Sequence, residues 1–229
     1  MKAREFIDVW EKFVNEKSIK DRLLSNWNNK SKWTEQTIGY ACAGSCPSDN
    51  DPQSEGHSPF GEYLIEALRT GWRYQKEYKH VDLVIARKDN MRRPYSWEAH
   101  EQVLWSAHFH PIIPEILIEQ ESSCGISWQE MEKLILLRSR LKVLITYTYD
   151  KGHEQSENLN HATSRQFKAM LEDAWRECPE FEETEYLLII GQLDEAGEDA
   201  KANWYCSIFS ANGTAVPKEA WMDFSTLKQ

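Results

Sequence analysis

Two acidic side chains at the end of an apolar run are the residues of this sequence best suited to chemistry. Residues 115–121 read Glu-Ile-Leu-Ile-Glu-Gln-Glu, and side chains of an extended strand alternate between its two faces. Glu119 and Glu121 therefore share one face with Leu117. Carboxylates that are buried together are costly unless a cation or a metal ion neutralises them. We therefore expect positive charge beside Glu119 and Glu121.

A third acid, Asp82, stands near the start of the apolar run Val-Asp-Leu-Val-Ile-Ala at 81–86. If this run and residues 115–121 are neighbouring strands, Asp82 and Glu119 meet at one edge of a sheet. Mg²⁺ prefers carboxylates and water as ligands. A bound metal ion also lowers the pKa of its water and stabilises a leaving oxygen. The ordered set of acids is therefore typical of a metal-dependent centre that hydrolyses phosphodiesters.

The elements that must position these acids follow from the pattern of apolar residues. Ser127 and Glu130 have the spacing of a capping box, which predicts a helix from 127 to about 140. Residues 141–147 are rich in Val, Leu and Ile, as is usual for a strand that is covered on both faces. A strand, a helix and a second strand predict a parallel pair with a right-handed connection.

The rest of the chain alternates between amphipathic, apolar and polar segments. Phe6, Trp10 and Phe13 follow helical spacing, and so predict an amphipathic helix over 2–16. Turn-forming residues dominate 44–59, which we expect to be a loop. The same reasoning predicts helices at 18–28, 60–73, 96–108 and 163–178 and a short helix from Pro217, strands at 33–43, 74–78, 186–192 and 204–210, and a polar loop at 150–161.

The order Glu62, Asp82, Glu119-Gln120-Glu121, followed by a helix and an apolar strand, resembles the PD-(D/E)xK nuclease superfamily over about residues 60–149. The resemblance implies an α/β fold with a restriction endonuclease-like α-β-β-β-α-β core. Its mixed sheet would be flanked by helices, with N-terminal helices and C-terminal strands added. We expect residues 1–58 to form a helical extension with a loop, and 59–229 to form the nuclease-like domain, together as one globular unit.

The resemblance also assigns roles to single residues. It implies Asp82 and Glu119 as ligands of Mg²⁺ or Mn²⁺, the backbone carbonyl of Gln120 as a further ligand, and Glu62 as an accessory acid. Glu121 stands where the family usually has Lys. Some restriction endonucleases of this superfamily have Glu there, assigned to the metal or to water activation. The catalytic residues implied are therefore Asp82, Glu119 and Glu121.

The implied partner is a nucleic acid, most naturally DNA, and a homodimer is compatible with the apolar N-terminal helices. The phosphates would be held by basic side chains around the acids, namely Arg87, Lys88, Arg92, Arg93 and Lys133. The formal net charge of −10 argues against general nucleic-acid binding. Together with the missing Lys at 121, it favours an alternative, a catalytically inactive binding module in a host-defence or mobile-element context.

Simpler interpretations of the same acids stay open at this stage. Asp82 also suits an ordinary turn, and Glu62 suits the first turn of a helix because of the helix dipole. Glu119 and Glu121 could lie exposed on an edge strand, where charges prevent aggregation. In that case the chain is an α/β interaction protein whose acids are all surface charges.

Other candidate sites in the sequence carry less information. Cys42 and Cys46 with His57 suggest zinc, but a second pair at ligand spacing is missing. His108 and His110 share one face of an extended segment and suit either a metal or a structural role.

Composition limits the class of protein. A chain of 229 residues that is 41% hydrophobic is long enough for one domain with a substantial core. It contains no run of about 18 apolar residues, so we expect no membrane span. Five scattered cysteines and an N-terminus without an apolar signal core predict a reducing, cytoplasmic location.

Overall fold

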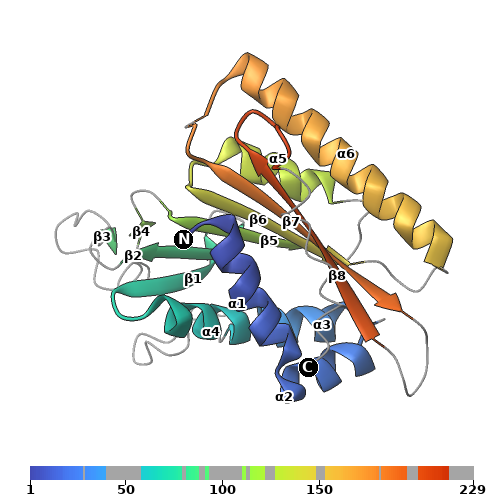
Figure 1. Cartoon of the computed structure of the whole chain (residues 1–229). Coiled ribbons are helices and arrows are strands. Elements are labelled where there is room, and N and C mark those ends of the chain that lie inside the picture. Colours follow the sequence, from blue (N-terminus) through green and yellow to red (C-terminus); the bar gives the residue numbers. More distant parts are fainter. Residues whose placement is uncertain are drawn as a thin grey trace.

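A six-stranded mixed sheet lies at the centre of the computed structural model (Figure 1), and its strand order is β1-β2-β5-β6-β7-β8. The structure describes residues 1–27, 29–39, 58–78, 81–87, 91–92, 110–111, 114–121, 127–147, 153–180, 182–194 and 201–216. The strands of the sheet are β1 (Trp72–Tyr78), β2 (Val81–Arg87), β5 (Ile116–Glu121), β6 (Leu141–Tyr147), β7 (Glu185–Asp194) and β8 (Lys201–Ser210). Two short strands, β3 (Met91–Arg92) and β4 (His110–Pro111), pair separately.

The middle of the sheet is parallel and its edges are antiparallel. β5 pairs with β6 and β6 with β7 in parallel, whereas β1–β2, β2–β5 and β7–β8 are antiparallel. Helices α5 (Trp128–Leu136) and α6 (His153–Glu177) form the two parallel crossovers. The predicted parallel pair and the predicted mixed sheet with flanking helices are therefore confirmed.

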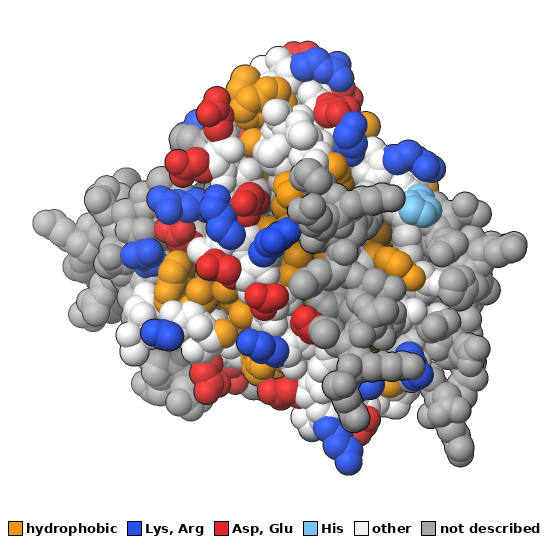
Figure 2. Space-filling model, viewed as in Figure 1, with side chains coloured by type: hydrophobic (Ala, Val, Ile, Leu, Met, Phe, Trp, Pro, Cys, Tyr) orange, Lys and Arg blue, Asp and Glu red, His pale blue; other side chains and the backbone are white. Residues whose placement is uncertain are grey.

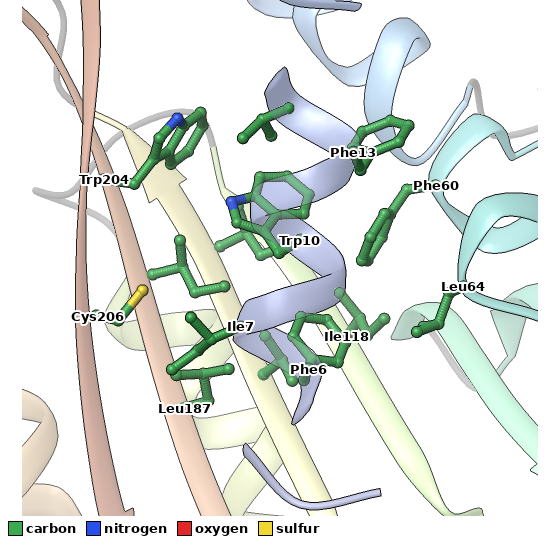
Figure 3. Close-up of a cluster of buried hydrophobic side chains, with 14 of the residues drawn as sticks. Phe6, Ile7, Trp10, Phe13, Phe60, Leu64, Ile118, Leu187, Trp204 and Cys206 are labelled. Carbon is green, nitrogen blue, oxygen red and sulfur yellow. The ribbon is translucent and has the colours of Figure 1, made fainter. Parts of the chain in front are cut away.

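One face of the sheet is covered by the N-terminal helices α1 (Ala3–Asn15), α2 (Lys17–Ser25), α3 (Lys30–Thr37) and α4 (Pro59–Leu68). Figure 3 shows Trp10 of α1 between Phe60 of α4 and Trp204 of β8. The ring centroid of Trp10 lies 4.8 Å from the ring centroid of Phe60 and 5.2 Å from that of Trp204, and both pairs pack edge to face. Aromatic residues bury large apolar areas, so these helices belong to the same core as the sheet.

Helices α5 and α6 cover the opposite face (Figure 1). Met131 and Leu134 of α5 and Phe167 and Leu171 of α6 are buried against the second side of the strands. β6 consequently has no exposed residue, as its apolar sequence predicts. The result is a three-layer α/β/α arrangement in which one sheet separates two apolar cores.

Some expectations about elements need correction, and others fall on residues that the structure does not describe. Residues 33–43 were expected to begin a strand, but 30–37 are helix α3, where the Asn29 side chain caps the backbone N–H of Lys32 at 3.2 Å. Trp33 is fully buried, so tertiary packing outweighs the local strand preference. The predicted loop at 150–161 is wrong because α6 begins at His153. The predicted loop at 44–59 lies almost entirely outside the described residues. The predicted helices at 96–108 and from Pro217 lie entirely outside them.

Within the described part of the chain, none of the helices combines the length and the apolar character that crossing a bilayer requires.

Candidate functional site

The register of β2 and β5 brings Asp82 and Glu119 together. Leu83 pairs with Ile118, so the next residues of the two antiparallel strands, Asp82 and Glu119, face each other across the pair. The backbone N–H of Gln120 donates a 2.7 Å hydrogen bond to the Asp82 carboxylate and fixes that side chain. Like charges directly opposite each other destabilise a sheet, so another group must offset their repulsion.

Glu119 is the most deeply buried of these acids. It is fully buried, and neither of its carboxylate oxygens accepts a hydrogen bond from the described residues. A hydrogen bond between Glu119 and the carboxylate of Glu130 on α5 requires a proton on Glu119, which then donates, because two ionised carboxylates can only accept. A proton or a cation is therefore needed at this position.

Lys133 supplies the positive charge that the sequence led us to expect. Its Nζ lies 3.5 Å from Glu119 Oε1 and forms a closer ion pair with Glu130, three residues earlier on α5. The helix thus turns both side chains toward the end of β5. The predicted capping box does not form, because the Ser127 side chain makes no capping hydrogen bond and Glu130 instead holds Lys133.

One lysine does not balance the acids of this carboxylate centre, which comprises Asp82, Glu119, Glu130 and Lys133. Burial and, to a smaller extent, the charges of Asp82 and Glu130 together raise the pKa of Glu119 to about 10, against the opposing effect of Lys133. Burial lowers the pKa of Lys133, but its hydrogen bond to Glu130 and the surrounding carboxylates outweigh this effect and raise it. The centre therefore has room for one more positive charge.

Gln120 connects the centre to the other face of the sheet. Its side-chain oxygen accepts a 2.5 Å hydrogen bond from Thr37, and its amide nitrogen donates to Thr34 at 3.1 Å. Helix α3 is thereby tied to the strand that carries Glu119. Glu121 lies on the same face as Glu119, beside Thr146 of β6, and is partly exposed.

The structure does not bring Glu62 to the carboxylate centre. Glu62 lies in the first turn of α4, on the opposite side of the sheet, and accepts a 3.3 Å hydrogen bond from the hydroxyl of Tyr74. The α5 residues Glu130 and Lys133 take its place beside Glu119. Their i, i+3 spacing next to the buried Met131 and Leu134 is the only sequence signal that could have identified them.

Of the five predicted nucleic-acid contacts, only Arg87 and Lys133 have side chains that the structure describes. Arg87 is exposed, and its guanidinium lies 5.2 Å from the ring of Trp72. Lys133 is held by carboxylates, whereas Lys88, Arg93 and the side chain of Arg92 lie outside the described residues. On the side of the molecule in Figure 2, the described basic and acidic side chains are interspersed. Nucleic-acid binding stays a prediction.

A second buried charge lies on the same face of the sheet, at the start of β6. Lys142 is fully buried, and its Nζ lies 2.6 Å from Glu180 Oε2 and 2.9 Å from the hydroxyl of Tyr186. That hydroxyl in turn donates a 2.5 Å hydrogen bond to Glu180. Burial lowers the pKa of Lys142 to about 8, although Glu180 opposes the shift. These three residues form the lysine network.

Comparisons with known proteins leave the family open. No family model matches the chain, and no curated protein matches it. One similar solved structure is a carbon–nitrogen hydrolase from Helicobacter pylori G27, with 8% sequence identity and a TM-score of 0.38. The match covers 72% of this chain and 62% of that enzyme, so the chain spans less than two thirds of its length. A likeness this weak carries no argument about what the chain does.

These findings correct the predicted family and function. No family model and no curated protein supports membership of the PD-(D/E)xK superfamily or the predicted nuclease function, including its inactive nuclease-fold alternative, so these predictions are withdrawn. Among the described residues, no three His, Cys, Asp or Glu side chains are grouped so that they could hold a metal ion. The physical reason is visible at Glu119, where Lys133 supplies the positive charge and Glu62 lies elsewhere. The described residues therefore contain no preformed metal site with three or more acidic ligands.

Proposed function

We propose that this chain is an α/β domain that binds one divalent cation, Mg²⁺ or Mn²⁺, at Glu119. The observation that carries the proposal is a fully buried carboxylate with two oxygens that accept no hydrogen bond from the described residues. Buried polar groups are nearly always paired in proteins, so such an exception calls for a ligand. A cation satisfies both oxygens and offsets the repulsion from Asp82 and Glu130.

The donor set suits a magnesium-like ion that keeps most of its water. Mg²⁺ is commonly held by one or two carboxylates and retains several water molecules, so three protein ligands are not required. Glu119 and Asp82 would be the ligands, with the Gln120 carbonyl as the third predicted donor. When bound, such an ion would polarise a ligand oxygen or lower the pKa of its water.

Isothermal titration calorimetry with MnCl₂ tests this function. We expect wild-type protein to bind Mn²⁺ at about 1 mM metal or below, and Glu119→Gln, which keeps the shape but removes the charge, to lose that binding. Glu172→Gln is the matched control, because Glu172 is an exposed α6 residue paired with Lys168. Equal Mn²⁺ binding by wild type and Glu119→Gln would show that the proposal is wrong.

The finer fold prediction, a restriction endonuclease-like core, is proposed as a description of topology alone. Its support is the order α4, β1, β2, β5, α5, β6 once the separate short pair β3–β4 is set aside, with β5 and β6 adjacent and parallel. This order matches the α-β-β-β-α-β pattern, and no nuclease activity is inferred from it. A crystal structure in which β5 and β6 were not neighbours would show that the proposed core topology is wrong.

A further inference from the structure

Lys133 occupies the place beside Glu119 in which the proposed cation would sit. Its Nζ is 3.5 Å from Glu119 Oε1, a distance that gives Coulomb attraction without satisfying that oxygen by a hydrogen bond. The closer ion pair of the ammonium group is with Glu130. Lys133 is therefore shared between two carboxylates and is bound more tightly to the one on its own helix.

The side chain of Lys133 has room to move away from Glu119. It is 38% exposed, whereas the side chain of Glu119 is 1% exposed. Glu130 lies one turn back on α5, and its side chain is 15% exposed, so it is more accessible to solvent than Glu119. A small movement of the flexible lysine stem toward Glu130 would keep that ion pair and release Glu119.

We propose that Lys133 is an internal counter-ion that holds the cation position at Glu119 and yields it to a divalent cation, with Glu130 as the second position of its ammonium group. The inference rests on the proposed function and adds how cation binding at Glu119 is regulated. A lysine ammonium and a divalent ion repel each other strongly at such short distances in a partly buried site. Lys133 therefore sets how tightly the site binds metal.

Substitution of Lys133 by Met tests this role, because Met keeps an unbranched apolar stem and removes the charge. We expect Lys133→Met to bind Mn²⁺ about tenfold more tightly than wild type, since the competing charge is gone. Lys168→Met removes one charge from the exposed Lys168–Glu172 pair on α6 and is the matched control. Its Mn²⁺ affinity should equal that of wild type.

A double-mutant cycle separates competition from a simple change in charge. Glu130→Gln removes the second position of the ammonium group, so Lys133 stays on Glu119 and Mn²⁺ binding weakens. In the Lys133→Met background the same substitution should weaken binding less, since only a nearby negative charge is lost. Equal effects of Glu130→Gln in the two backgrounds would overturn the exchange between two positions.

The outcomes distinguish this inference from the proposed function. If wild type binds Mn²⁺ and Lys133→Met binds equally or more weakly, the counter-ion role is wrong and the cation site stands. If wild type and Lys133→Met both fail to bind Mn²⁺, the proposed function is wrong and the counter-ion role falls with it. Binding by Lys133→Met alone would show that the lysine blocks the site without yielding it, which would overturn both the cation binding of the wild-type chain and the exchange.

A second readout follows Lys133 itself. Mg²⁺ should drive the ammonium group away from Glu119, so the rate of its acylation by an amine-reactive ester should rise in wild type when Mg²⁺ is added. Mass spectrometry measures the modification at Lys133 and, as an internal control, at Lys168. An acylation rate at Lys133 that does not depend on Mg²⁺ would contradict the displacement.

Discussion

The carboxylate centre and the lysine network lie on the same face of the sheet and use the same residue types, but they differ in how completely their polar atoms are paired. The amine of Lys142 contacts both a carboxylate and a hydroxyl, and these two groups also bond to each other. Neither oxygen of Glu119 accepts a hydrogen bond from the described residues. Among the described residues, Glu180 has one buried oxygen without a hydrogen-bond partner, whereas both oxygens of Glu119 lack one. The better-paired network therefore fits a structural role, and Glu119 fits a place for a ligand.

Their positions along the strands fit this division. Lys142 is the second residue of β6, whereas Glu119 and Glu121 close β5, so the two sites lie toward opposite ends of adjacent parallel strands. Ligands of α/β proteins gather at the carboxyl ends of the strands. The amino end, where the network lies, is the end at which substitutions mainly affect stability.

The largest expected effect concerns the pH dependence of stability at Glu119. Its pKa in the folded protein is about 10, against an ordinary value of 4.5, so between these values the folded state holds a proton that the unfolded state has lost. Stability is therefore highest below pH 4.5 and falls as the pH rises toward 10, by at most about 1.4 kcal/mol per pH unit. Glu119→Gln cannot titrate and should lack this loss.

Urea unfolding at pH 4.5, 7 and 9, without divalent metal, measures this difference. We expect Glu119→Gln and wild type to be similar at pH 4.5, and the variant to be increasingly the more stable protein at pH 7 and 9. Lys142 titrates in both proteins, so its contribution largely cancels in the comparison. An advantage of wild type that grows with pH would mean that Glu119 is a paired carboxylate, and the contrast with the lysine network would disappear.

The next largest effect is expected for Lys142→Ala. This change removes one partner of a largely buried ion pair and leaves the Glu180 carboxylate without its counter-charge. The free energy of unfolding should therefore fall by about 3 kcal/mol. Urea unfolding at pH 7 measures the loss. A loss below about 1 kcal/mol would mean that the network contributes no more to stability than a surface ion pair, and that it has no structural role.

A smaller effect is expected for Tyr186→Phe, which deletes one hydroxyl from the lysine network. Lys142 keeps Glu180, so the cost should be that of one hydrogen bond, about 1 kcal/mol. The same urea measurements show whether the network acts as a unit. Tyr186→Phe and Lys142→Ala should be clearly non-additive in the double variant, and simple additivity would argue against coupling.

The smallest effect is expected for Lys168→Ala, which breaks an exposed ion pair on α6. Lys168 Nζ lies 2.7 Å from Glu172, but both side chains are well exposed, at 45% and 39%. Such a pair contributes about 0.3 to 0.5 kcal/mol, so unfolding in urea should barely change. A loss as large as that of Lys142→Ala would show that burial is not what separates the two lysines.

Much of the sheet could be predicted because its central strands have few alternatives. Residues 81–86, 115–121 and 141–147 are apolar runs that only burial on both faces explains, and the structure places strands there within one residue. The helix at 2–16 was equally clear from its aromatic spacing. By contrast, α3 and the start of α6 are polar segments, and the burial of Trp33 in α3 depends on tertiary packing that a local pattern does not contain.

The site was only half predictable, for a related reason. The alternation of side chains in a strand placed Glu119 and Glu121 on one face, and the strand pattern put Asp82 near them. Nothing local indicated that Glu130 would hold Lys133 instead of capping its own helix, or that Glu62 would lie exposed beside Tyr74 on the other side of the sheet. These outcomes depend on how α4 and α5 pack, which is a property of the whole fold.

The sequence by itself determined the central strands, the parallel crossover and the presence of acids that require a positive charge. These features could be predicted because the spacing of apolar residues and the cost of burying a charge can both be judged from a few neighbouring residues. Only the tertiary structure decided that Lys133 stands beside Glu119 and that Lys142 pairs with Glu180, since the partners come from different segments whose packing brings them together. Electrostatic energy depends on distance and burial, and neither exists until the layers of the protein have packed.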